Sequence, residues 1–177
     1  MDPVPVTSRP LVVGYGNTLR GDDGVGPRVA ELLATDPRLA GAVVLARHQL
    51  TPELAADIAE ASVVVFVDAS ENGQPGAISV RRIDRAPRDA TLGMGGEDRD
   101  RSEPEAGSGS AAWTHHVDAE SLLALARELW GGSPAAFVVG VGVEAMELGD
   151  DLSADVERAL PAVIEAVARI VAEHARG

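Results

Sequence analysis

The sequence predicts an α/β fold, in which the strands of a mostly parallel sheet alternate with helices. Short apolar runs rich in β-branched residues alternate along the chain with stretches whose apolar residues recur at helical spacing. The run VVVFV at 63–67 is continuous, as expected of a central parallel strand buried on both faces. The length of 177 residues suits one domain, so we expect a single domain spanning 1–177.

The first half of the chain sets this alternation. It contains, in order, an expected strand at 11–13, a helix from Val25, a strand at 43–46, a helix at 51–60 and the strand at 63–67. Thr51 is expected to cap the second helix, with Pro52 at its first helical position. In 77–83, Ile78 and Val80 alternate with polar residues, which predicts an edge strand with one solvated face.

The second half begins with a polar stretch and then returns to regular patterns. Residues 84–112 contain five glycines and eleven charged residues, so we expect a disordered loop there, and a flexible N-terminus at 1–9. A helix is expected at 119–130, stopped by Gly131-Gly132, then a strand at 135–143 that ends in Glu144. The apolar face of that helix is Leu122, Leu123, Leu125, Ala126 and Leu129. A last helix is expected at 153–175, with Ser153 as N-cap and Pro161 as a bend or a first-turn residue.

Composition limits the classes of function. The formal net charge of −13 argues against nonspecific binding of nucleic acid, which needs a basic face. The sequence has no cysteine, which excludes a disulfide framework, a thiolate nucleophile and a zinc–thiolate site. Residues 1–9 have no apolar core of a signal peptide, and no segment is apolar enough to span a membrane. We therefore expect a cytoplasmic protein without a membrane partner.

The most informative stretch is the glycine-rich loop between the first strand and the first helix. Gly14-Tyr15-Gly16 suggests a dinucleotide site, but Leu19 occupies the position of the third glycine. Asp22 and Asp23 stand where the helix begins, and two carboxylates there would repel a phosphate. One aspartate is enough for a helix cap, so the second favours a cation site or a catalytic site.

Other acids and histidines are expected at the same edge of the sheet. Asp68 follows the strand at 63–67, and the carboxyl ends of parallel strands share the edge where α/β proteins place their sites. His115 and His116 precede a helix, and either alone is also a plausible helix-entry residue. Two carboxylates and an imidazole would leave coordination positions of a metal open for reaction.

The loop also resembles a known family. The loop contains the motif Gly14-x-Gly16-Asn17-x-Leu19-x-x-Asp22-Asp23-Gly24-x-Gly26. This motif is similar to the N-terminal signature of the hydrogenase maturation endopeptidases. The resemblance continues through the strand ending in Asp68, a Thr-His-His segment opening a helix, and a final strand and long helix. It implies a three-layer α/β/α sandwich with a twisted, five-stranded sheet, and an aspartic-type peptidase by family classification.

The resemblance also implies a site and a substrate. Asp23, Asp68 and His115 match the family's metal-contacting residues, with Asp23 and Asp68 as the catalytic acids; a shift of one residue would replace His115 by His116. Asp22 is then expected to be a helix cap. Gly14 and Gly16 are expected to turn the chain, while Gly24 and Gly26 let the helix start close to the sheet.

The implied reaction is removal of the C-terminal extension of the nickel–iron hydrogenase large-subunit precursor after nickel insertion. Nickel is expected to arrive with the substrate, without a permanently bound cofactor. Metal activation of water or of the scissile carbonyl, and an aspartate acting as general base, both remain open. Two other functions are also compatible with these residues: a non-catalytic nickel-binding maturation module, and a metal-dependent hydrolase of small substrates.

Overall fold

The fold is described from a computed structural model. The described residues are 8–83, 117–144, 146–149 and 151–174. The first seven residues of the expected flexible N-terminus, the expected loop at 84–112, His115 and His116 lie outside them.

Five strands form one sheet in the described residues, in the order β2-β1-β3-β5-β4. The pairs β1–β2, β1–β3 and β3–β5 are parallel, and only β4 runs antiparallel to its neighbour. In chain order the elements are β1 (Leu11–Tyr15), η1 (Gly21–Gly24), α1 (Val25–Leu33), η2 (Pro37–Leu39), β2 (Val43–Arg47), α2 (Leu54–Glu60), β3 (Val63–Ser70), β4 (Ile78–Ile83), α3 (Ala119–Trp130), β5 (Ala135–Gly142) and α4 (Ala154–His174). The predicted mostly parallel, five-stranded sheet is confirmed.

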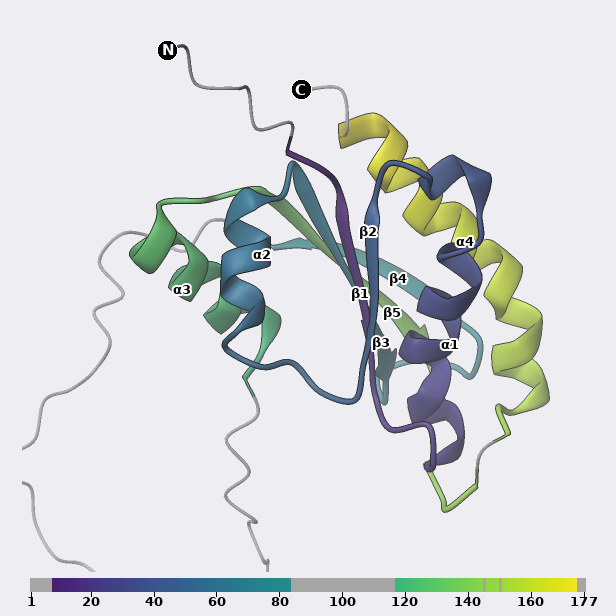
Figure 1. Ribbon diagram of the computed structural model, residues 1–177. Coiled ribbons are helices and arrows are strands. Elements are labelled where there is room, and N and C mark those ends of the chain that lie inside the picture. The colour runs from purple at the N-terminus through teal and green to yellow at the C-terminus, as the bar shows by residue number, and fades with distance from the viewer. Residues whose placement is uncertain (1–7, 84–116, 145, 150, 175–177) are drawn as a thin grey trace, which may run out of the picture.

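The sheet is the middle of three layers. Figure 1 shows α1 and α4 on one face of the twisted sheet and α2 and α3 on the other. The side chains of β1 divide accordingly: Val12 packs with α1 and α4, whereas Leu11 and Val13 pack with α2 and α3. This alternation follows from the two-residue period of a strand. The predicted α/β/α sandwich is therefore confirmed, with one apolar core on each side of the sheet.

The chain order of the strands creates a switch point between β1 and β3. After β1 the chain passes through α1 to β2, on one side of β1; it then returns through α2 to β3, on the other side. After β3 the chain continues to β4, on the far side of β3 from β1, so the connections that leave the neighbouring strands β1 and β3 lead in opposite directions. Ligand sites of open α/β sheets lie outside the carboxyl ends of the strands at such a point. This is where the glycine-rich loop and Asp68 lie.

Several element boundaries differ from the predicted ones. Helix α2 begins at Leu54 instead of the predicted Pro52, and Thr51 is not its N-cap, because Thr51 and Pro52 form a tight turn whose carbonyls accept hydrogen bonds from Leu54 and Ala55. Strand β3 continues past Val67 to Ser70, so Asp68 lies inside the strand. The predicted N-cap of α4 is confirmed by a 3.5 Å hydrogen bond from the Val156 amide to Ser153 Oγ. Pro161 lies inside α4, whose described part ends at His174.

Two predicted apolar positions are solvent-exposed. Val80 of the edge strand β4 is 46% exposed, like the other residues in the middle of this strand. Leu129, predicted on the buried face of α3, is 60% exposed, whereas Leu122 and Ala126 are fully buried. Helix α3 ends as predicted, because Gly131 adopts the left-handed conformation with φ 74°.

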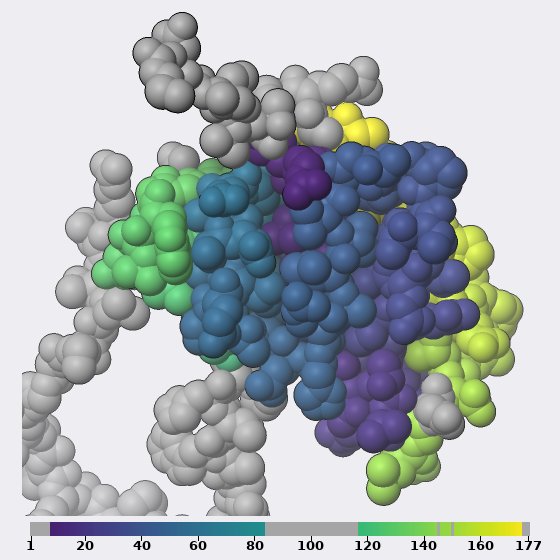
Figure 2. All heavy atoms as spheres, in the orientation of Figure 1, coloured from purple at the N-terminus to yellow at the C-terminus, as the bar shows by residue number. Residues whose placement is uncertain are grey.

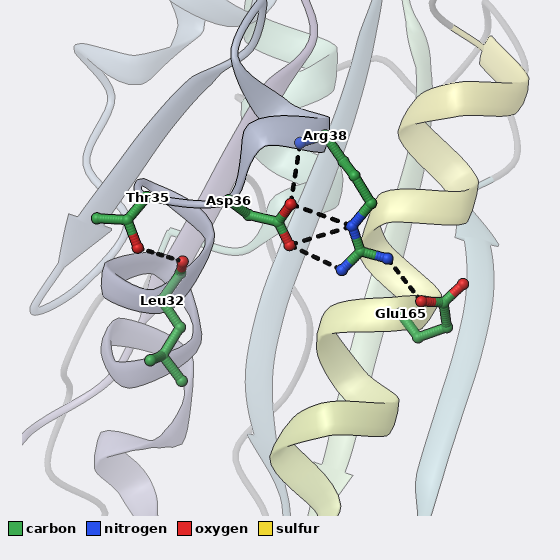
Figure 3. Close-up of polar contacts among 5 residues, drawn as sticks. All are labelled: Leu32, Thr35, Asp36, Arg38 and Glu165. Atoms are coloured by element: carbon green, nitrogen blue, oxygen red, sulfur yellow. Dashed lines mark hydrogen bonds and ion pairs between the residues drawn. The ribbon is translucent and has the colours of Figure 1, made fainter.

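A surface ion-pair network joins η2 to α4. Figure 3 shows the Arg38 guanidinium between the carboxylates of Asp36 and Glu165, with N–O distances of 2.7 and 2.6 Å. Asp36 also caps η2 by accepting a hydrogen bond from the Arg38 amide. The network lies in solvent, where screening keeps such pairs weak, so it orients η2 more than it stabilises the fold.

Among the described residues, no helix is both long and apolar enough to cross a membrane.

Candidate active site

The glycine-rich loop packs closely against the sheet because two glycines face each other. A Cβ on Gly14 would lie 2.0 Å from the carbonyl oxygen of Gly26. A Cβ on Gly26 would lie 2.3 Å from the Tyr15 carbonyl oxygen and 2.6 Å from that of Val67. Gly26 therefore has the predicted role of bringing the helix close to the sheet. The predicted role of Gly14 was wrong: it lies within β1, and its function is to make room for α1.

Gly16 is the residue at which the chain turns out of the sheet. Its φ of +143° is unfavourable for a residue with a side chain. A Cβ at this position would lie 1.9 Å from the backbone oxygen of Asp23 and 3.4 Å from its Oδ1 atom. Glycine at position 16 therefore leaves space beside the carboxylate of Asp23, as well as making the turn.

Asp23 is held by the loop that it belongs to. The Asn17 amide donates a 3.1 Å hydrogen bond to Asp23 Oδ2. The Asn17 side chain in turn accepts a 2.9 Å hydrogen bond from the Leu19 amide, and the Asp23 amide donates to the Arg20 carbonyl. The carboxylate is half-buried. This loop thus orients one oxygen of Asp23 through the backbone.

Asp68 approaches the same place from β3. Its Oδ2 atom accepts a 2.7 Å hydrogen bond from the hydroxyl of Tyr15, the last residue of β1. Burial raises the pKa of Asp68 above its ordinary value, and repulsion by the negative charge of Asp23 adds to this, while hydrogen bonds from Tyr15 and Ala69 oppose it. The structure therefore places Asp23 and Asp68 at the same edge of the sheet, where the charge of Asp23 acts on the carboxyl group of Asp68.

Tyr15 is a site residue that the sequence analysis missed. Burial raises its pKa well above the ordinary value, and the charge of Asp68 raises it further, so the phenol stays neutral and donates its proton. Tyr15 follows Leu11 and Val13 at a spacing of two and packs on the same face of the sheet. The sequence shows this alternation, but it does not show that the Tyr15 hydroxyl bonds to Asp68.

Asp22 has a structural role different from the predicted helix cap. It is 1% exposed, and its side chain makes no cap of η1 or α1. Its two oxygens accept hydrogen bonds from the Glu144 amide (3.2 Å) and the Ser153 amide (2.6 Å). Asp22 thus joins the glycine loop to the segment between β5 and α4.

Only two of the three predicted metal-contacting residues lie within the described residues. Asp23 and Asp68 are described, whereas His115, and its alternative His116, lie outside the described residues. Within the part of the chain that the structure describes, no three histidine or acidic side chains gather in a way that could hold a metal ion. The described site offers two carboxylates with a neutral phenol beside them, a set that can accept a proton or contribute oxygen ligands to a cation.

The titration of Asp68 gives a direct test of this pairing. In Asp23→Asn the pKa of Asp68 is expected to fall, because a repelling charge is removed; in Tyr15→Phe it is expected to rise, because a donor is removed. Carbon-detected NMR of the Asp68 carboxyl group measures both shifts. Glu173→Gln, an exposed change near the far end of α4, is the matched control. An unchanged Asp68 pKa in Asp23→Asn would show that the two carboxylates do not interact.

The fold and the two carboxylates at the switch point define an α/β sandwich protein with an acidic site at the carboxyl edge of its sheet. Solved structures with this fold include hydrogenase maturation endopeptidases. HybD from Escherichia coli superimposes with a TM-score of 0.67 at 24% identity over 93% of each chain. A hydrogenase 2 maturation peptidase from a Thaumarchaeota archaeon gives a TM-score of 0.63 at 26% identity, over 93% of this chain and 99% of that one.

The protease HycI from Thermococcus kodakarensis, a NiFe hydrogenase maturation protease, gives a TM-score of 0.62 at 22% identity over 93% of each chain. No family model matches the chain, and no curated protein matches it. The resemblance inferred from the glycine loop is thus confirmed by structure: the chain is similar to hydrogenase maturation endopeptidases over nearly its whole length.

Proposed function

We propose that this protein is an endopeptidase of hydrogenase maturation, which removes the C-terminal extension of the nickel–iron hydrogenase large-subunit precursor. The observation that carries the proposal is the placement of Asp23 and Asp68 at the switch point of a fold shared with hydrogenase maturation endopeptidases. Neither feature is sufficient alone, since one fold hosts many functions and paired acids occur in many sites.

In this proposal nickel is part of the substrate. The precursor presents its nickel ion to the carboxylates of Asp23 and Asp68 and to the imidazole of His115, and these complete its coordination. Nickel accepts mixed oxygen and nitrogen ligands. Recognition of the bound ion would restrict cleavage to precursor that has already received its metal, because an empty precursor lacks the group that the acids bind.

Hydrolysis requires water to attack the carbonyl carbon, the C–N bond to break, and a proton to reach the departing amine. Nickel held by the substrate supplies polarisation of the carbonyl or of the water. The residues of this chain supply position and proton transfer. Asp68 suits the part of a base, since its raised pKa increases its affinity for a proton, and Tyr15 fixes the orientation of its Oδ2 atom.

The test is a processing assay on full-length precursor with and without nickel. Nickel-loaded precursor is expected to be shortened at its C-terminus, as measured by intact-protein mass spectrometry, whereas nickel-free precursor is expected to stay intact. Binding of the loaded precursor without shortening would indicate a nickel-binding maturation module. Retention of about one metal equivalent after dialysis, with hydrolysis of small substrates, would indicate a metal-dependent hydrolase with its own ion.

A further inference from the structure

An unusual pair of exposed leucines borders the candidate site. Leu19 of the glycine loop is 65% exposed, and Leu148 of the segment before α4 is 94% exposed. A single exposed apolar side chain needs no explanation. These two come from distant parts of the sequence, however, and the backbone brings them together.

The two leucines are adjacent because their segments pair. Arg20 and Gly149 form a parallel bridge, with a 3.1 Å hydrogen bond from the Gly149 amide to the Leu19 carbonyl and a 2.6 Å bond from the Gly21 amide to the Gly149 carbonyl. Leu19 and Leu148 are the residues immediately before the bridged pair, so they are in register. The bridge therefore holds the two exposed leucines next to each other along the chain segments that it joins. Figure 2 shows the purple glycine loop beside the green segment that leads to α4.

This arrangement is held rigidly. Asp22 is buried and accepts hydrogen bonds from the amides of Glu144 and Ser153, which lie on either side of Leu148 in the sequence. A buried carboxylate bound by two amides fixes the segment to the glycine loop. Hydrogen bonds to a buried carboxylate thus hold two apolar side chains in solvent. This indicates a surface that contacts another molecule.

The surface continues into a groove between α1 and α4. The groove has a volume of about 610 Å³, and its apolar lining is Leu19, Leu152 and Leu160. Its charged lining is three acids and one base, Arg28, and that base is paired with Glu31 at 3.2 Å. The remaining acids are Asp151 and Glu157, so the groove is negatively charged. It is complementary to a segment that carries both apolar and basic side chains.

We propose that Leu19, Leu148 and the acidic groove form the docking surface for the protein substrate, through an apolar segment that bears basic residues. The proposal deepens the function proposed above and depends on it. Leu19 and Asp23 belong to the same short loop, so a chain resting on the leucines lies against the loop that carries one of the two carboxylates. The docking surface would select the protein substrate, while the carboxylates act on it.

The test compares precursor processing by Leu19→Ser, Leu148→Ser and the double variant with that by Leu129→Ser. Leu129 is 60% exposed at the C-terminal end of α3, near the opposite edge of the sheet, and is therefore a control matched in chemistry and exposure. Each docking variant is expected to raise KM about tenfold with kcat unchanged, because only uniform binding is lost. Leu129→Ser is expected to keep both constants.

The charged groove has its own readout. Asp151→Asn combined with Glu157→Gln is expected to raise KM and to weaken its dependence on salt, because charge complementarity is screened by ions.

A double leucine variant with wild-type KM would overturn the docking proposal alone, while the wild type still processes precursor. A wild type that fails to process nickel-loaded precursor would overturn the proposed function and this inference together. Self-association lost in the double leucine variant, with KM unchanged, would assign the surface to a second copy and overturn the proposal.

Discussion

Replacing Asp68 by asparagine is expected to reduce processing of nickel-loaded precursor by at least about 100-fold, since loss of a general base or charged ligand commonly costs that much. Asparagine has nearly the same shape and keeps an oxygen for the Tyr15 hydroxyl, but it carries no charge and accepts no proton. Asp23→Asn is expected to give a similar loss, because the Asn17 amide can still donate to its oxygen while the charge is gone. Single-turnover mass spectrometry of the precursor measures both variants.

The stability of Asp68→Asn separates a chemical effect from unfolding. The pKa of Asp68 is raised in the folded protein, so protonation favours folding and the ionised carboxylate opposes it. This contribution to stability is present below the unfolded-state pKa and is lost as pH rises through the folded-state pKa. At neutral pH the asparagine variant is therefore expected to be at least as stable as the wild type. Asp57→Asn, an exposed change on α2, is the control and should process normally. Full processing by both site variants would refute the assignment.

The fold could be predicted because its signals are local. The spacing of apolar residues defines each strand and helix, and the continuous run at 63–67 identifies the central strand. Boundaries failed where a tertiary contact decides them. Gly14 suggested the end of a strand, but the strand continues to Tyr15, because Gly14 lies against Gly26 rather than in a turn. No local pattern distinguishes a glycine that turns from one that makes room.

The site was only partly predictable for the same reason. Topology brings Asp23 and Asp68 to one edge of the sheet, and the order of strands and helices in the sequence was enough to expect this. The Tyr15 hydroxyl finds Asp68 53 positions away, and Asp22 finds its amide partners 122 and 131 positions away. Such partners depend on the register of the whole sheet. The roles of Asp23, Asp68 and His115 in nickel binding stay predictions.

Asp22→Ala is expected to lower the free energy of unfolding by about 3–5 kcal/mol, because it leaves two partly buried amides without their charged acceptor. A helix cap would cost about 1 kcal/mol, and Asp118→Ala supplies that comparison. Asp118 caps α3 by accepting a 2.7 Å hydrogen bond from the Ser121 amide at an exposed helix end. Urea unfolding of both variants measures the difference.

The losses of unfolding free energy in Asp22→Ala and Asp118→Ala together decide the role of Asp22. If Asp22→Ala costs no more than Asp118→Ala, Asp22 acts only as a local cap and does not hold the segment before α4. A much larger loss would show that the glycine loop and this segment fold as one unit. In that case hydrogen exchange of the Gly149 and Gly21 amides, which bond across the bridge, is expected to accelerate in Asp22→Ala. Asp22 then builds the rim of the site, a structural task separate from the catalytic one proposed for Asp23.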